Sequence, residues 1–211
     1  MLIKVCGMRE AENIRSISAL DIHWMGFIFY PRSPRCVEEG ALAGQLAACL
    51  CRAPRPLTVG VFVNATSEQM MERQLTYGLD YLQLHGEESP DTCYALKKRG
   101  IRVIKSFAIS ETADFEQTEA YEERADYFLF DTRCSGYGGS GRSFDWSLLS
   151  AYQGETPFLL SGGITPDSTA SLLHLYHPLL VGIDLNSGFE IAPGLKDVSK
   201  IKTFIEKINK K

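Results

Sequence analysis

Two side chains with complementary acid–base chemistry end apolar runs of the chain. Cys6 closes the run Leu2–Cys6, and Asp131 closes the run Tyr127–Asp131. A free thiol ionises at a pH of about 8.5 and acts as a base once it has lost its proton. A carboxylic acid at an apolar rim can keep its proton and act as an acid. Together the two residues predict general acid–base catalysis, provided that the fold brings them to one place.

Each of these residues also has a plain structural interpretation. A lone cysteine is more often a small buried apolar residue, and Asp131 can cap a helix or form an ion pair. Lys4 has the same strand parity as Cys6, which suits it to stabilise a thiolate. His85 ends a further apolar run, and we interpret it as structural rather than catalytic.

The elements that must position these residues are eight apolar, β-rich runs that alternate with helical patterns. The runs are Leu2–Cys6, Trp24–Tyr30, Thr58–Asn64, Tyr81–His85, Arg102–Phe107, Tyr127–Asp131, Phe158–Ser161 and Leu180–Leu185. Helices are predicted over Ala11–Leu20, Glu38–Leu50, Glu68–Tyr77, Asp91–Arg99, Ala113–Arg124 and Asp167–Tyr176, with an amphipathic last helix near the C-terminus. Strands that alternate with helices form a parallel sheet.

Eight such units predict an α/β fold, a single-domain (β/α)8 TIM barrel that spans residues 1–211. The alternative is an open doubly wound sheet. No Pro- or Ser-rich linker divides the chain, which favours one domain. In such a barrel the functional residues lie at the carboxyl ends of the strands, so Cys6 and Asp131 are predicted to face one mouth.

Two glycine-bearing segments follow the seventh and eighth runs and predict a phosphate site. Barrels that act on phosphorylated substrates bind phosphate at these two places, often with the start of a short extra helix. Glycine lets the backbone approach an anion closely. The predicted phosphate and sugar site consists of Gly162, Gly163, Asp184, Asn186, Ser187 and Gly188. The alternative is two tight turns with no ligand.

The loop after the second run places arginine between prolines, in the segment Pro31–Arg35. Arg35 or Arg32 is suited to grip a carboxylate or a phosphate through two parallel hydrogen bonds. A surface ion pair is the alternative interpretation.

A glycine-rich loop after the sixth run, Gly136–Gly141, has the spelling of a dinucleotide-binding fingerprint in the wrong context. Four residues separate it from the preceding run, and no ribose-binding acid follows at the required place. The loop is therefore predicted to be either a lid over the barrel mouth or an ordinary surface loop.

Composition excludes several classes of function. The 211 residues carry 22 basic and 26 acidic side chains, a net charge of −4, and no basic stripe, which argues against nucleic acid as a partner. No apolar run is long enough for a membrane span, and no signal peptide is seen. The six cysteines form no Cys-x-x-Cys pair, so neither a zinc site nor a disulfide framework is predicted. A cytoplasmic protein with reduced thiols is expected.

Taken together, these segments resemble the phosphoribosylanthranilate isomerase family, (β/α)8 enzymes of tryptophan biosynthesis. The resemblance covers nearly the whole chain. Its segments are Lys4–Gly7, Gly26–Phe29, Ser33–Arg35, Val59–Asn64, Leu82–Gly86, Phe130–Asp131, Ser161–Gly163, Gly182–Glu190 and Pro193–Asp197. Ser161 stands where the family often has alanine, and Asn186 stands where it often has serine. Both departures keep the neighbouring glycines.

The resemblance implies the Amadori rearrangement of N-(5′-phosphoribosyl)anthranilate to the 1-deoxyribulose 5-phosphate product. It implies that Asp131 is the general acid at the ring oxygen and Cys6 the general base at C2′. Arg35 would hold the anthranilate carboxylate, the two glycine segments the phosphate, and Asp184 would lie near the sugar. The resemblance implies no metal and no organic cofactor.

Two other functions stay open at this stage. A bifunctional barrel isomerase that also serves histidine biosynthesis is related, but it has aspartate where Cys6 stands. A non-catalytic phosphate-sugar-binding barrel would keep the glycine segments and would have no need of Cys6 with Asp131. The expected partner is a small phosphorylated substrate, and the expected assembly is a monomer or a homodimer.

Overall fold

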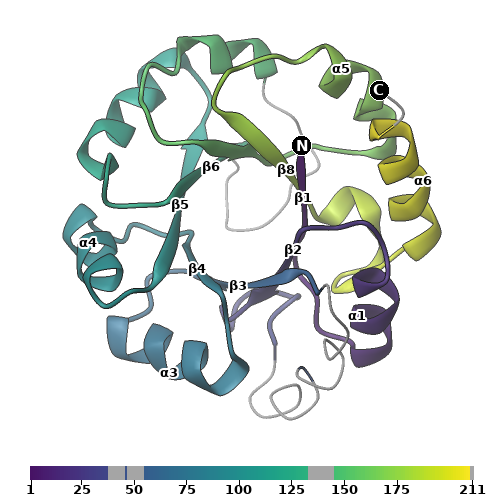
Figure 1. The fold of residues 1–211 in the computed structure, drawn as a ribbon, viewed down its shortest axis with the longest axis horizontal. Helices are drawn as coiled ribbons and strands as arrows, with labels where there is room; N and C mark the ends of the chain where they lie inside the picture. The colour runs from purple at the N-terminus through teal and green to yellow at the C-terminus, as the bar shows by residue number, and fades with distance from the viewer. Residues whose placement is uncertain (38–45, 47–54, 133–144, 210–211) are drawn as a thin grey trace.

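Eight parallel strands close into a barrel in chain order, and β8 pairs with β1 (Figure 1). A computed structural model of the protein describes residues 1–37, 46, 55–132 and 145–209. The strands are β1 (Leu2–Val5), β2 (Trp24–Ile28), β3 (Leu57–Phe62), β4 (Tyr81–Leu84), β5 (Arg102–Ile109), β6 (Tyr127–Thr132), β7 (Phe158–Leu160) and β8 (Leu180–Leu185). The predicted (β/α)8 barrel is confirmed, and the open-sheet alternative is wrong.

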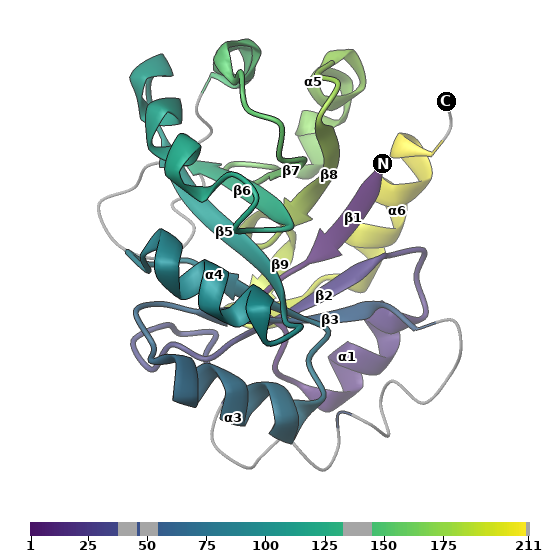
Figure 2. The same ribbon diagram turned by 60° about the vertical axis from the view of Figure 1, so that its left-hand side comes forward.

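Helices lie on the outside of this barrel (Figure 1, Figure 2). They are α1 (Ala11–Ser18), α3 (Ser67–Tyr77), α4 (Pro90–Lys98), α5 (Thr169–His174) and α6 (Val198–Ile208). Local sequence fixes their starts: a capping box joins Thr66 to Gln69 before α3, and Ser89 caps α4 ahead of Pro90. Of the predicted helix Glu38–Leu50, all but residue 46 lies outside the described residues, as does the glycine-rich segment Gly136–Gly141.

The predicted α-helix Ala113–Arg124 is wrong in type, because this segment forms a 3₁₀ helix, η1 (Thr112–Tyr121). Phe115 and Thr118 are buried three residues apart, and the Thr118 hydroxyl donates to the Phe115 carbonyl oxygen at 2.7 Å. A spacing of three suits a helix with three residues per turn. The sequence analysis took the same pattern for an α-helical face.

Two short elements were not predicted: η2 (Trp146–Ala151) and the hairpin of β9 (Glu190–Ala192) with β10 (Leu195–Lys196). The short helix η3 (Pro166–Ser168) lies at the start of the predicted helix Asp167–Tyr176, and η4 (Ser187–Phe189) is the short helix that the sequence suggests near Asn186. Gly194 turns the hairpin with a φ of 84°, a conformation that glycine adopts without strain. None of the helices in the part of the chain that the structure describes has the length and hydrophobicity of a membrane span.

Side chains inside the barrel change from apolar to polar toward the carboxyl ends of the strands. One buried cluster fills the opposite end and consists of Trp24, Val59, Tyr81, Ile104, Leu129 and Leu159. Because side chains alternate along a strand, residues two positions further on point inward one layer nearer the mouth. By this rule Gln83, Ser106 and Asp131 follow Tyr81, Ile104 and Leu129. The barrel mouth therefore presents polar side chains above an apolar layer.

Candidate active site

Cys6 lies just beyond β1 at the barrel mouth and is nearly buried. Its backbone N–H donates to the Leu185 carbonyl oxygen of β8 at 2.9 Å, and the residue is 3% exposed. Gly26 of β2 makes room for it, since a Cβ at Gly26 would lie 2.7 Å from the Cys6 sulfur. Burial raises the pKa of the Cys6 thiol, and the nearby Lys4 ammonium opposes that effect.

A buried ion pair lies one layer beneath this thiol. Lys4 Nζ is 2.8 Å from Asp184 Oδ2, and both side chains are almost fully buried. Burial lowers the pKa of Lys4, but Asp184 and Cys6 outweigh it, so that the pKa is raised overall. Burial also raises the pKa of Asp184 against the opposing effect of Lys4. Asp184 Oδ1 has no hydrogen-bond partner among the residues that the structure describes.

Asp131 lies on β6 at the same end of the barrel, and His85 lies beside its carboxylate. The distance from His85 Nε2 to Asp131 Oδ2 is 3.5 Å, and the two side chains are 25% and 28% exposed. Asp131 and His85 both act electrostatically on Asp184, as does Cys6. The predicted acid and base therefore share one mouth, with Asp184 in range of both.

The sequence analysis did not predict that His85 lies beside Asp131. The signal was present in the chain: Gln83 and His85 are two residues apart, so both point into the barrel. Gln83 Nε2 lies 2.8 Å from His85 Nδ1 and donates to Ser106 Oγ at 3.2 Å.

Arg35 reaches the mouth from the loop after β2, as predicted, but its main partner is Glu190. Arg35 Nε donates to the two Glu190 carboxylate oxygens at 2.9 and 3.0 Å, and Nη2 donates to Oε2 at 2.6 Å. Lys196 Nζ donates to Glu190 Oε1 at 2.7 Å and to Asn186 Oδ1 at 2.8 Å. Burial raises the pKa of Glu190, but Arg35 and Lys196 outweigh burial and lower it.

This ionic cluster links the arginine to the glycine segment after β8. Gly7, which follows Cys6, packs against both Arg35 and Asn186. A Cβ at Gly7 would lie 2.9 Å from Arg35 Cδ and 2.9 Å from Asn186 Oδ1. Asn13 of α1 fixes Lys196 from outside, through hydrogen bonds of 2.8 and 2.9 Å to its backbone. Glu190 and Lys196 were not predicted as site residues, because the hairpin that presents them was not predicted.

The two predicted phosphate segments lie against each other. A Cβ at Gly188 would lie 2.4 Å from the Ile164 carbonyl oxygen, so only glycine allows this approach. Gly162 and Gly163 have φ values of 83° and 66°, which turn the chain directly after β7. The structure thus brings together the glycines that sequence analysis paired by position.

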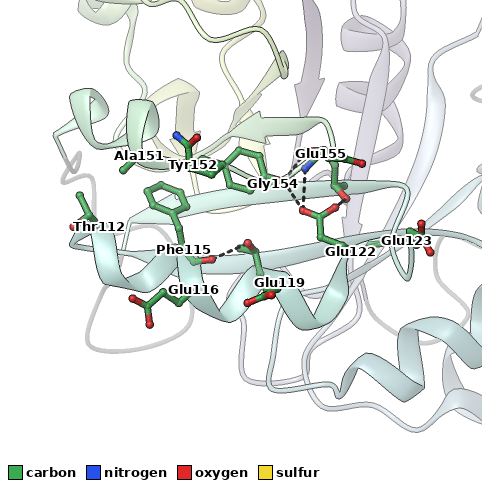
Figure 3. Close-up of a pocket in the computed structure, with 14 residues that line it drawn as sticks. Thr112, Phe115, Glu116, Glu119, Glu122, Glu123, Ala151, Tyr152, Gly154 and Glu155 are labelled. Atoms are coloured by element: carbon green, nitrogen blue, oxygen red, sulfur yellow. Dashed lines mark hydrogen bonds between the residues drawn. The ribbon is translucent and has the colours of Figure 1, made fainter.

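A surface cavity of about 860 Å³ lies elsewhere, between η1 and η2 (Figure 3). Its lining runs from Thr112 at the start of η1 to Thr156 just before β7 and includes neither Cys6 nor Asp131. Several glutamates surround it, and Glu122 accepts hydrogen bonds there from Tyr152 Oη and Glu155 N at 3.0 and 3.2 Å. The Glu122 carboxylate thus connects the end of η1 with the segment that follows η2.

Comparison with known proteins decides which barrel family carries this site. The family model described as N-(5′-phosphoribosyl)anthranilate (PRA) isomerase matches residues 3–207. The chain belongs to the N-(5′-phosphoribosyl)anthranilate isomerase family. The fold class, the family and the isomerase function predicted from sequence are confirmed.

Relatives in this family match along nearly their whole length. An N-(5′-phosphoribosyl)anthranilate isomerase of Parabacteroides distasonis is 60% identical over 208 residues, which are 99% of this chain and 93% of the relative. That of Phocaeicola vulgatus is 49% identical over 211 residues, 100% and 99% of the two chains.

Solved structures show the same barrel. The phosphoribosyl anthranilate isomerase of Thermotoga maritima matches with a TM-score of 0.82 and 33% identity, over 99% of this chain and 98% of that chain. A further isomerase structure, solved with reduced 1-(o-carboxyphenylamino)-1-deoxyribulose 5-phosphate, matches with a TM-score of 0.81, 31% identity and the same coverage.

Proposed function

We propose that Asp131 and Cys6 divide the proton transfers of the family's isomerisation between them. The observation that carries this proposal is their convergence: Cys6 leaves β1 and Asp131 ends β6 at one barrel mouth, with Asp184 in electrostatic range of both. A base and an acid on opposite sides of a sugar are what an aldose–ketose rearrangement needs. Neither residue would need a metal for these transfers.

In the first step Asp131 gives its proton to the furanose ring oxygen. The bond between this oxygen and C1′ breaks, and the anilino nitrogen supplies an electron pair to form a C1′–N iminium. The proton is therefore delivered where negative charge would otherwise develop on the leaving oxygen. The Asp131 carboxylate that remains lies 3.5 Å from His85 Nε2.

In the second step the Cys6 thiolate removes the proton from C2′. The electrons of that C–H bond form a C1′–C2′ double bond, and the iminium nitrogen regains its electron pair. The resulting enolamine becomes the ketone when C1′ takes up a proton and the C2′ hydroxyl loses one. Lys4 stabilises the thiolate form of Cys6 by charge.

Substrate binding is assigned to the residues that surround this pair. Glu190 engages two of the three Arg35 guanidinium nitrogens, and we assign the third, Nη1, to the anthranilate carboxylate. The unpartnered Oδ1 of Asp184 is suited to accept a sugar hydroxyl. The phosphate is assigned to the backbone of Gly162, Gly163, Asn186, Ser187 and Gly188, whose segments touch.

A direct assay with N-(5′-phosphoribosyl)anthranilate tests the function, since substrate consumption is followed by fluorescence. Turnover by the purified protein is expected. Substrate binding without turnover would favour the phosphate-sugar-binding barrel. Turnover of the corresponding histidine-pathway substrate as well would favour the bifunctional isomerase.

Two further expectations, a cytoplasmic location and a monomer or homodimer, stay predictions for cell fractionation and light scattering.

A further inference from the structure

We propose that Gln83 and His85 form a hydrogen-bonded chain to Asp131 that holds the carboxyl group in place and stabilises its carboxylate. In this hydrogen-bonded chain the His85 ring is neutral and carries its proton on Nε2. From Nε2 it donates a hydrogen bond to Asp131 Oδ2. His85 is a positioning residue for the acid and does not touch the substrate. The inference rests on the proposed function, because it takes Asp131 as the general acid.

The hydrogen bonds of Gln83 select the proton position on His85. Gln83 Nε2 lies 2.8 Å from His85 Nδ1 and 3.2 Å from Ser106 Oγ, and an amide nitrogen has two protons to donate. Since the amide donates to Nδ1, this nitrogen must be an acceptor. The ring proton of neutral His85 is then on Nε2, the nitrogen that faces Asp131 at 3.5 Å.

The opposite orientation of the Gln83 amide is less favourable. As placed, Gln83 leaves one of its own buried atoms, Oε1, without a hydrogen-bond partner among the described residues. The reverse orientation would put both amide protons at that position and would leave two buried donors unmatched. Each unmatched buried polar group is destabilising, so one unmatched acceptor is preferred to two unmatched donors.

Gln83 is firmly held. It is 1% exposed and lies in the polar layer beneath the mouth. Ser106 of β5, the strand between β4 and β6, receives its second proton. The chain therefore runs from a rigid interior position to a residue at the mouth that is about one quarter exposed.

A buried ion pair between Lys105 and Glu88 holds the segment that carries His85. Lys105 Nζ donates to the Leu84 and Gly86 carbonyl oxygens, on either side of His85, at 3.2 and 2.7 Å. It also lies 3.4 Å from Glu88 Oε2, which accepts from Gly86 N at 2.9 Å. The imidazole ring is thereby held at both neighbours in the chain.

A buried charged group near His85 and Asp131 comes from β8. Asp184 is close enough for both to act on it electrostatically, and Lys4 neutralises Asp184 at 2.8 Å.

The consequence for catalysis follows from the hydrogen bond that we propose between His85 and Asp131. A donor binds a carboxylate more strongly than it binds a carboxylic acid. As Asp131 gives up its proton, the bond from His85 strengthens and stabilises the charge that appears on Oδ2. This stabilisation exists in the transition state and not in the substrate complex, so its loss lowers kcat rather than raising KM.

Substitutions at His85 and Gln83 separate this role from a structural one. We expect His85→Leu to lower kcat at least about 10-fold with KM changed less than about 3-fold, within the range for acid–base assistance. His85→Gln, which keeps an N–H donor, is expected to recover most of the lost kcat. Gln83→Met removes the donor to Nδ1 and should lower kcat as well. His174→Leu, at an exposed histidine, is the matched control with unchanged kinetics.

A spectroscopic readout does not depend on activity. Nitrogen-15 NMR of the four histidine rings at about pH 7.5, with His85 identified from the His85→Gln spectrum, should show neutral His85 protonated on Nε2. Gln83→Met should remove this single proton position. The inference would be overturned by a wild-type His85 ring protonated on Nδ1, or by wild-type kcat in His85→Leu. In either case an inactive Asp131→Asn would still support the proposed function. An active Asp131→Asn would instead overturn the proposed function.

Discussion

Lys4 and Asp184 form an ion pair of 2.8 Å in the barrel interior, one layer beneath Cys6. A buried ion pair is costly to form and stabilises little compared with apolar packing. Here it places a cation beside a thiol whose pKa burial raises, and the charge of Lys4 opposes that rise. Lys4 thus favours the thiolate form of Cys6, while Asp184 acts against it.

The ionisation of Cys6 gives a first prediction. Burial raises the pKa of Cys6 above its ordinary value, despite the opposing charge of Lys4. Below that pKa the thiol predominates, and the thiolate fraction rises about tenfold for each pH unit. Alkylation of Cys6 by iodoacetamide, followed by peptide mass spectrometry, should therefore accelerate steadily from about pH 7 to about pH 9. A rate that is already constant across this range would show a lowered pKa instead.

Removal of the Lys4 charge gives a second prediction. Lys4→Met should raise the pKa of Cys6 further, because Lys4 lowers it in the wild type. At a fixed pH we expect alkylation of Cys6 and kcat to fall together by about tenfold, the effect of one pKa unit. Lys202→Met, at an exposed lysine of α6, is the control and should change neither. Unaltered alkylation in Lys4→Met would separate this lysine from the thiol.

The space beside Cys6 gives a third prediction. In Gly26→Ala the new methyl group would lie 2.7 Å from the Cys6 sulfur, which must then move. We expect lower kcat and a loss of about 1–3 kcal/mol in the free energy of unfolding, as in other overpacked cores. In a Cys6→Ala background the same Gly26→Ala change should cost much less, because the sulfur is gone. An equal cost in both backgrounds, measured by denaturant unfolding, would place the strain elsewhere.

The ion pair of Arg35 with Glu190 gives a fourth prediction. Glu190→Gln removes the charge that holds Arg35 through two nitrogens, and Arg35→Met removes the guanidinium itself. Both variants should raise KM for the anthranilate substrate, Arg35→Met by more, while kcat changes less. Glu206→Gln, at an exposed position of α6, is the control. A fall in kcat at unchanged KM would move Arg35 from substrate binding to chemistry.

Much of this site follows from local patterns in the sequence. The alternation of apolar runs with helical segments predicts a barrel, and position at a strand end then places Cys6 and Asp131 at its mouth. Gly162 and Gly188 were paired by the same rule, and their segments do touch. Each of these predictions depends on the chain near the residue itself.

The contacts that sequence analysis missed join residues far apart in the chain. Arg35 and Glu190 are separated by 155 positions, and their pairing depends on the β9–β10 hairpin, whose strands have two and three residues. Such short strands carry too little alternation to be recognised. The approach of His85 to Asp131 depends on the barrel curvature across β5, which no local pattern encodes.

The assignment of Cys6 as base and Asp131 as acid is tested most directly by turnover of N-(5′-phosphoribosyl)anthranilate in two purified variants. With folding verified by circular dichroism, Cys6→Ala and Asp131→Asn should each lower kcat at least about 100-fold, the scale expected for acid–base groups. Near wild-type turnover in either folded variant would contradict the assignment.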